Sequence, residues 1–468
     1  MIEIMPIWDY KSSVPLYVQL YKYIKDEIRA GTIKPDSKLP SKRKLACSLG
    51  ISQNTIQTAF DQLCAEGYVE SRPRIGLFVK KLEDNLISTL PNISNIYELE
   101  KNEDDFEYIM DFRASDVDLN NFPYSTWRKL TMQSLYSDQG NLLLIGDEQG
   151  NEALRKEIVK YLFQSRCVRC DAEQIVIGAG TQYMLILLSM LVGKDHVYGI
   201  ENPGYNRARN VLKNQGITVL PITVEEDGIC IDALRKSPAK VVYITPSHQF
   251  PRGSIMPVSR RLELLNWCEK NHGYIIEDDY DSEFRYKGRP IPSLQGLDKN
   301  GNVIYLGTFS KSLIPSMRIS YLVLPPKLLK KYQKCFNTYK QTVSGLHQDT
   351  LYRFMKEGYF STHINKMRTL YRKKHTVLIS AIYKYMKDNV EIIGEKSGLH
   401  ILLRVKNGMT EDELIRSARE LKIKVYPTSI YYAENTSAQA SIILLGFGGL
   451  TEAQIEAGIK TLNKAWFT

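Results

Sequence analysis

Apolar and polar positions in the first eighty residues follow the periods of three short helices and a hairpin. Helical spacing joins Leu16, Leu20, Tyr23, Ile24 and Ile28. Gly31 then ends this predicted helix. Ser41 and Ser52 are the expected N-caps of two further helices, the second over residues 53–65. Residues 68–72 and 77–79 read as two short strands and predict a wing that closes a module over 1–80.

This order of elements is typical of a winged helix-turn-helix, whose recognition helix enters the DNA major groove with its N-terminus first. The amides of Gln53 and Asn54 suit adenine, whereas Ser52 and Thr55 suit a phosphate or a thymine methyl group. Further candidate DNA contacts are Gln57 on the same outward face and, for the phosphate backbone, Lys42, Arg43, Arg72 and Arg74. A winged helix used only for protein contacts is the alternative.

Beyond residue 80 the helical period fades, and polar residues predict a linker over 81–108. From residue 109 onward, short apolar runs alternate with amphipathic helices. The expected strands are residues 174–177, 197–200, 240–244, 274–276 and 303–306. This alternation predicts an α/β domain over 109–468, with a mostly parallel sheet that helices cover on both faces. Residues 345–468 are expected to form its smaller C-terminal part, with a long helix and a second α/β unit.

Polar and charged residues follow these strands, at the sheet edge where parallel sheets bind ligands. Residues 180–182 lie between a strand and a helix, a geometry in which backbone N–H groups bind phosphate. Tyr205 follows the next strand, and an acidic run over 277–281 directly follows the strand 274–276. Lys311 closes a polar run after another strand, and Arg318 lies seven residues beyond it.

Together these residues supply what pyridoxal phosphate (PLP) requires of a protein. PLP needs a lysine for a Schiff base, an acid that keeps its pyridine nitrogen protonated, an aromatic face and a phosphate cup. Lys311, Asp278 and Tyr205 supply the first three. The phosphate cup is predicted from Gly180, Thr181, Gln182, Thr308, Ser310 and Arg318. The alternative, a surface lysine among solvated acids, does not explain why these residues follow successive strands.

Three motifs resemble those of the MocR/GabR family of bacterial regulators: residues 245–253 (TPSHQFPRG), 276–284 (IEDDYDSEF) and 307–313 (GTFSKSL). Residues 39–46 (LPSKRKLA) resemble its GntR-type half. The resemblance implies a PLP-binding transcription factor, with a winged helix fused to a fold-type I aminotransferase-like domain in a head-to-tail homodimer. On the family's pattern Lys311 forms the aldimine, Asp278 contacts the pyridine nitrogen, Tyr280 lies near the ring hydroxyl, Tyr205 stacks on the ring, and Arg318 with Thr308 holds the phosphate.

The chain departs from aminotransferases where those enzymes hold their substrate. Phe250 stands where they carry an asparagine, and no arginine occurs between Leu421 and Thr468. Ser429 and Ile430 occupy a segment that carries a carboxylate-binding arginine in some family members.

Arg207 matches another arginine position of the family and is the candidate effector contact, or else a surface arginine at a helix start. The effector itself is PLP or an amino compound. Because the C-terminal arginine is missing, a sensor is favoured over an enzyme and no catalytic residue is assigned. An aminotransferase with a fused DNA-binding module is the alternative.

Composition limits the partners, the metal sites and the cellular compartment that we expect for this protein. The chain has 468 residues, with 62 Lys+Arg against 52 Asp+Glu, a formal net charge of +10 that permits an anionic partner. Seven scattered cysteines predict no disulfide framework, and the pair Cys167 and Cys170 lacks partners for a metal site, so no metal is expected. The most apolar stretch, residues 184–192, is too short for a membrane span. The start of the chain lacks a signal-peptide pattern, and a cytoplasmic protein is expected.

Overall fold

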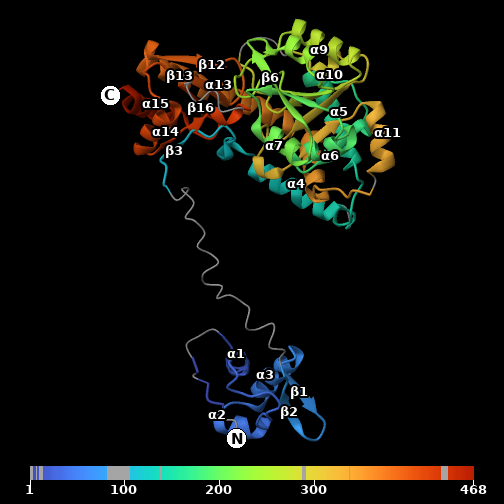
Figure 1. Cartoon of the computed structure of the whole chain (residues 1–468), viewed down its shortest axis with the longest axis vertical. Helices are drawn as coiled ribbons and strands as arrows, with labels where there is room; N and C mark the ends of the chain where they lie inside the picture. Colours follow the sequence, from blue (N-terminus) through green and yellow to red (C-terminus); the bar gives the residue numbers. More distant parts are fainter. Residues whose placement is uncertain are drawn as a thin grey trace. The chain divides into compact units, whose positions relative to one another are not determined.

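The structure, a computed structural model, describes residues 4–6, 8–9, 14–81, 106–137, 140–286, 291–336, 338–433 and 441–467. The chain divides into two units, Met1–Phe106 and Glu107–Thr468, and each is described by itself (Figure 1). Within the predicted linker, residues 82–105 lie outside the described residues.

The N-terminal unit is a winged helix-turn-helix, which confirms the predicted fold. Its elements are α1 (Leu16–Arg29), α2 (Lys42–Leu49), α3 (Gln53–Ala65), β1 (Val69–Arg72) and β2 (Gly76–Val79). Ser41 Oγ accepts the backbone N–H of Lys44 at 3.3 Å, and Ser52 Oγ accepts that of Thr55 at 3.1 Å, so both predicted N-caps are confirmed. Gly50 joins α2 to α3 at a φ of 66°, which favours glycine. The fully buried core includes Leu20, Ile24, Ile56, Ala59 and Leu63.

An eight-stranded sheet forms the centre of the larger unit. Its strands are β4 (Ile175–Gly178), β5 (Tyr198–Asn202), β6 (Val219–Glu225), β7 (Gly228–Ile229), β8 (Val241–Ile244), β9 (Tyr274–Asp279), β10 (Val303–Thr308) and β11 (Ser320–Val323). They lie in the order β4-β11-β10-β9-β8-β5-β6-β7. β11 is antiparallel to both of its neighbours and β7 is antiparallel to β6, whereas the other pairs are parallel. The mostly parallel sheet is therefore confirmed, with β6, β7 and β11 as strands that the apolar runs did not predict.

Helices cover both faces of this sheet, as predicted (Figure 1). One face packs against α6 (Thr181–Val192), α7 (Asn206–Asn214) and α11 (Pro326–Cys335). The other packs against α4 (Tyr124–Ser137), α5 (Glu152–Arg166), α8 (Ile231–Lys236), α9 (Val258–Lys270), α10 (Leu294–Leu297) and α12 (Gly345–Lys356). Side chains along each strand alternate between the two faces: Ile276 packs with the first set of helices and Ile275 with the second.

The C-terminal part has its own antiparallel sheet, in the order β12-β13-β16-β15. Its elements are α13 (Tyr359–Tyr385), β12 (Val390–Ile393), β13 (His400–Val405), α14 (Glu411–Glu420), β14 (Ile423–Lys424), β15 (Tyr426–Pro427), β16 (Ile442–Gly446) and α15 (Glu452–Phe467). β3 (Met110–Asp111) lies beside the C-terminal part (Figure 1) and pairs with β14. Phe112 is fully buried in the same core. The start of the larger unit thus packs with its end.

The prediction that the apolar strand stops at Ile276 and leaves the acidic run outside it is wrong. β9 continues to Asp279, and Glu277, Asp278, Asp279 and Asp281 are all buried, at most 5% exposed. Partners supplied by distant segments explain the difference, because hydrogen bonds and cations offset the cost of burying a carboxylate. Such partners cannot be read from the local pattern of apolar residues.

Candidate functional site

The carboxyl ends of β9 and β10 bring Asp278 and Lys311 into one region. β9 and β10 are parallel neighbours in which Asp278 pairs with Leu306, and Lys311 follows three residues after the end of β10. The Lys311 ammonium donates a hydrogen bond to the carbonyl of Ala114, which follows β3. Burial lowers the pKa of Lys311 to about 8, although the nearby acids Asp281 and Asp116 act to raise it. A lysine with this pKa supplies a substantial fraction of neutral, nucleophilic amine near neutral pH.

Asp278 has one carboxylate oxygen satisfied and one available. The Tyr243 hydroxyl donates to Oδ2, whereas Oδ1 is buried without a hydrogen-bond partner among the described residues. Burial raises the pKa of Asp278 to about 7. An unpartnered buried carboxylate oxygen calls for a donor, and a protonated ring nitrogen is the donor that PLP brings. This observation fits the predicted cofactor.

Replacing Asp278 with asparagine tests its burial in the protein prepared without cofactor. The folded-state pKa lies above the value of an unfolded aspartate, so the wild-type protein loses stability as the pH rises from about 4 to about 7. The asparagine side chain carries no charge to bury, and we expect the variant's gain in unfolding free energy over wild type to grow to about 2–4 kcal/mol by pH 8. Urea unfolding across this pH range measures it. A gain that stays constant with pH would contradict the assignment.

The predicted phosphate-cup residues lie at or next to the ends of three neighbouring strands and at one helix start. Thr308, at the end of β10, is the strand-pairing partner of Ser320 on β11. Ser320 is in turn paired with Gly178, at the end of β4. Thr308 Oγ1 lies 3.1 Å from Ser310 Oγ. Gly180 precedes α6 at a φ of 90°, and a Cβ there would lie 2.1 Å from the Arg318 guanidinium. Only glycine therefore allows Arg318 to reach the helix start, where Thr181 and Gln182 begin α6.

Aromatic rings surround Phe250 beside these residues. The Phe250 ring centroid lies 5.7 Å from that of Tyr205 and 6.2 Å from that of Tyr280. The Tyr280 hydroxyl donates to the carbonyl oxygen of His248 at 3.0 Å and also lies 2.9 Å from His248 Nδ1. His248 Nδ1 also lies 2.8 Å from Asp281, which links Tyr280 to a buried acid. The structure thus places Tyr205 and Tyr280 both within ring contact of Phe250.

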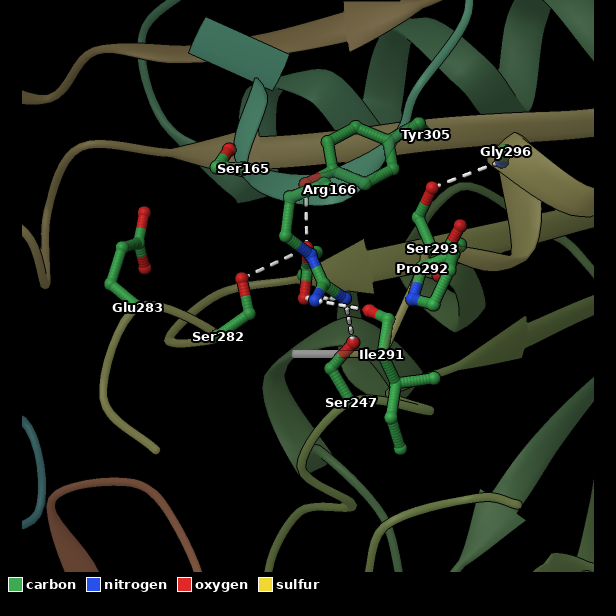
Figure 2. Close-up of polar contacts among 12 residues, drawn as sticks. Ser165, Arg166, Ser247, Ser282, Glu283, Ile291, Pro292, Ser293, Gly296 and Tyr305 are labelled. Atoms are coloured by element: carbon green, nitrogen blue, oxygen red, sulfur yellow. Dashed lines mark hydrogen bonds and ion pairs between the residues drawn. The ribbon is translucent and has the colours of Figure 1, made fainter. Parts of the chain in front are cut away.

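Sequence reasoning missed the group that supports Asp279 on the opposite face of β9. Figure 2 shows the Arg166 side chain, from the end of α5, pointing between Ser247, Ser282 and Tyr305. Its Nε donates to Asp279 Oδ2 at 2.7 Å, and the Tyr305 hydroxyl donates to the same oxygen at 2.6 Å. Burial alone would raise the pKa of Asp279, but Arg166 and these hydrogen bonds hold it below its usual value. No local signal pairs Arg166 with an acid 113 residues away.

Arg207 and Arg209 lie close together on α7 but differ in their contacts. Arg207, the candidate effector contact, is exposed. Arg209 instead donates to the carbonyls of Tyr431 at 3.2 Å and Ile430 at 3.1 Å. The backbone N–H of Gly204 also donates to the carbonyl of Tyr431. Arg209, which the sequence analysis did not single out, therefore ties the C-terminal part to the helix that follows Tyr205.

The candidate DNA contacts fall into two groups. Four side chains are already engaged within the unit: Ser52 and Thr55 (hydroxyls 2.9 Å apart), Gln57 (2.5 Å to Asp61) and Arg72 (2.7 Å to Asp36 and to Glu70). Those exposed at the surface are Lys42, Arg43, Gln53, Asn54 and Arg74. Asn54 and Gln53 lie in the first turn of α3, the end that a recognition helix directs into the major groove.

The described residues contain no group of three or more His, Cys, Asp or Glu side chains arranged to hold a metal ion. Every helix in the described ranges is too short or too polar to cross a bilayer.

Comparisons with known proteins were made for both units. Residues 16–79 match the bacterial regulatory proteins of the gntR family, and residues 108–462 match the family described as aminotransferase class I and II. The uncharacterized HTH-type transcriptional regulator YdeL of Bacillus subtilis is 43% identical, over 99% of this chain and 100% of that protein. The probable rhizopine catabolism regulatory protein MocR of Rhizobium meliloti is 35% identical, over 99% of this chain and 96% of that protein.

Solved structures share the fold of the larger unit. An archaeal alanine:glyoxylate aminotransferase superposes with a TM-score of 0.71 at 24% identity, over 76% of this chain and 90% of that one. A Pyrococcus horikoshii kynurenine aminotransferase gives 0.70 at 24% identity, over 82% of this chain and 96% of that one.

Proposed function

The chain belongs to the MocR-type family of DNA-binding transcriptional regulators, which join a gntR winged helix to a PLP-dependent aminotransferase class I and II domain, and on this basis we propose that it senses PLP or an amino compound at Lys311. The observation that carries this proposal is the pair formed by Asp278 of β9, with its unpartnered buried oxygen, and Lys311, with its lowered pKa, just beyond the neighbouring strand β10.

The residues of this chain have distinct parts in such a site. PLP, when bound, supplies an aldehyde that reacts with amines and a ring that withdraws electrons. Lys311 would provide the amine that attaches it, and the Asp278 carboxylate would accept a hydrogen bond from the protonated ring nitrogen. Gly180 leaves room for Arg318 to bind the phosphate at the start of α6, whose aligned N–H groups favour an anion. Tyr205 covers one face of the ring.

Sensing, rather than turnover, is the role we propose for this site. Residues 421–468 contain no arginine to hold a substrate carboxylate, and an amino acid would have to bind without that bidentate partner. The test measures operator DNA affinity of the full chain by fluorescence anisotropy, with and without PLP and amines, alongside transamination of the same amines. A change in affinity without turnover is expected. Turnover with unchanged DNA affinity would favour the aminotransferase instead.

Asn54 is expected to read a base in the operator. Its amide can donate to and accept from adenine, a pair that contributes about 1–3 kcal/mol of discrimination. Asn54→Ala should weaken operator binding by about 10- to 100-fold while leaving non-specific DNA binding nearly unchanged. Gln62→Ala, near the other end of α3, is the matched control. Equal losses on both DNAs would show that Asn54 does not read a base.

A homodimer accounts for an exposed apolar surface on the larger unit. Tyr136 at the end of α4 is 79% exposed, and Leu143, Leu144 and Ile145 are 69–76% exposed. Such a run of apolar side chains on a water-facing surface is typical of an interface. We expect Leu144→Glu to convert the dimer to a monomer, because a charge there would be desolvated at the interface. Light scattering after gel filtration measures this, and a monomeric wild-type protein would overturn it.

A further inference from the structure

A buried histidine links Tyr280 to a buried acid. His248, in the segment that follows β8, is 1% exposed, and Asp281, just beyond β9, is 2% exposed. His248 Nδ1 lies 2.8 Å from Asp281 Oδ2 and 2.9 Å from the Tyr280 hydroxyl oxygen. An ionised carboxylate can only accept hydrogen bonds, so Asp281 favours the form of the imidazole that carries its proton on Nδ1. That N–H then faces both oxygens.

This arrangement leaves the hydroxyl proton of Tyr280 for another acceptor. When Nδ1–H donates to the Tyr280 oxygen, the hydroxyl proton has to point away from the imidazole ring. In this structure the hydroxyl donates to the carbonyl oxygen of His248 at 3.0 Å. Burial raises the pKa of Tyr280 well above its usual value, and nearby acids act in the same direction, Asp281 first among them. Tyr280 is therefore a protonated hydrogen-bond donor.

The C-terminal part holds the imidazole of His248 in place. A Cβ at Gly398, where φ is 79°, would collide with His248 Cε1, so only glycine leaves room for the ring. The His400 ring centroid lies 4.9 Å from that of His248, and His400 Nε2 lies 3.1 Å from the carbonyl oxygen of Pro251. Close packing on these residues fixes the direction in which Nδ1 points.

The space beside His248 is too small for an effector. His248 and Asp281 line a cavity of about 20 Å³. A volume of this size holds one water molecule and excludes a molecule as large as PLP. Among the described residues, His248 Nε2 has no hydrogen-bond partner, so the polar contacts of the ring pass through Nδ1. His248 therefore reaches the cofactor site through Tyr280.

Tyr280 lies on the side of β9 that carries Asp278. The two residues are separated by one position, and side chains two apart along a strand share a face. Asp278 also acts on Tyr280 electrostatically. A ring whose nitrogen meets Asp278 therefore has the Tyr280 hydroxyl near its edge.

We propose that His248, with its proton fixed on Nδ1 by Asp281, is a positioning residue that directs the Tyr280 hydroxyl to the ring oxygen of bound PLP. The inference rests on the proposed function, which places PLP at Lys311 and Asp278. A hydrogen bond donated to the ring oxygen stabilises its negative charge, most of all once the attached nitrogen of Lys311 has lost its proton. The bond thus lowers the pH at which lysine-bound PLP gives up this proton.

The test follows the absorption of the PLP-loaded full chain against pH and takes the midpoint of the change. His248→Leu should raise this midpoint by about one pH unit, the equivalent of one hydrogen bond to a charged group. His248→Asn places an N–H where Nδ1 lies and should restore the wild-type midpoint. His248→Gln, whose amide lies nearer the place of Nε2, is the matched control and should behave like His248→Leu.

Other ionisable groups near His248 are separated from its effect by comparing variants. The cavity lining contributes cations that stay charged at every pH: Arg166, Arg261 and Arg285. Burial holds the pKa of His400 well below its usual value, so that ring is neutral. Asp278 and Glu201, whose pKa values burial raises to about 7, are present in wild type and variants alike. Asp281 is not substituted, because its charge also acts on Lys311.

Tyr280→Phe should raise the midpoint as His248→Leu does, and the double variant should show no further shift, because both changes remove one hydrogen bond. An unchanged midpoint in His248→Leu would overturn the inference, and so would a further shift in the double variant. If His248→Leu does not fold, equal midpoints in His248→Asn and His248→Gln would overturn it. These failures leave the proposed function intact, since each is read on a chain that carries PLP. A wild-type chain that does not bind PLP would overturn both.

Discussion

Replacing Lys311 with alanine is expected to abolish both the attachment of PLP and the response of operator affinity to effector. Lys311 is the amine that attaches the cofactor in our proposal, and burial already lowers its pKa to about 8, where the neutral form is available. The wild-type protein should show a visible absorption band from lysine-bound PLP, and the variant should lack it. Gel filtration should then separate PLP from the variant but not from the wild type.

Lys330→Ala on the exposed face of α11 is the matched control, because it removes an exposed lysine that is not among the candidate cofactor residues. It should keep the absorption band and the response of operator affinity. A Lys311→Ala protein that responds to PLP or amines like the wild type would show that sensing does not pass through this lysine. Melting curves of both variants verify that each is folded.

Arg166→Met is expected to destabilise the larger unit by about 3–5 kcal/mol. The substitution leaves Asp279 buried without its cation, and an uncompensated buried charge is far more costly than the loss of a surface pair. Urea unfolding followed by tryptophan fluorescence measures the change, since three of the four tryptophans lie in this unit. The loss should shrink as the pH falls, because protonation of Asp279 removes the unpaired charge.

Arg235→Met gives the comparison for an exposed ion pair. Arg235 lies 3.0 Å from Asp232, with side chains 49% and 77% exposed, and its removal should cost less than about 1 kcal/mol. If Arg166→Met costs no more than Arg235→Met, the Arg166 network shown in Figure 2 does not stabilise the fold. A loss that does not depend on pH would indicate that lost packing, rather than charge, explains it.

Elements governed by local interactions could be predicted from the sequence. Ser41 and Ser52 cap helices through hydrogen bonds that span three residues, and the apolar runs of β4, β5, β8 and β10 are buried strands because each is apolar on both faces. The candidate PLP-site residues could be predicted for the same reason, since each lies at or just beyond the end of a strand or begins a helix. Chain order alone then indicated that these residues meet at one edge of a sheet.

The tertiary structure decided which polar groups are buried, paired or exposed. β9 carries its acids into the sheet because Arg166 and Tyr243 reach it from segments far along the chain. Gln57 and Arg72 are held by neighbouring acids, although the sequence pattern marked them as DNA contacts. Arg209, rather than Arg207, is the α7 arginine bound to the C-terminal part. Burial and long-range pairing depend on packing between distant segments, and a local pattern of residues does not encode them.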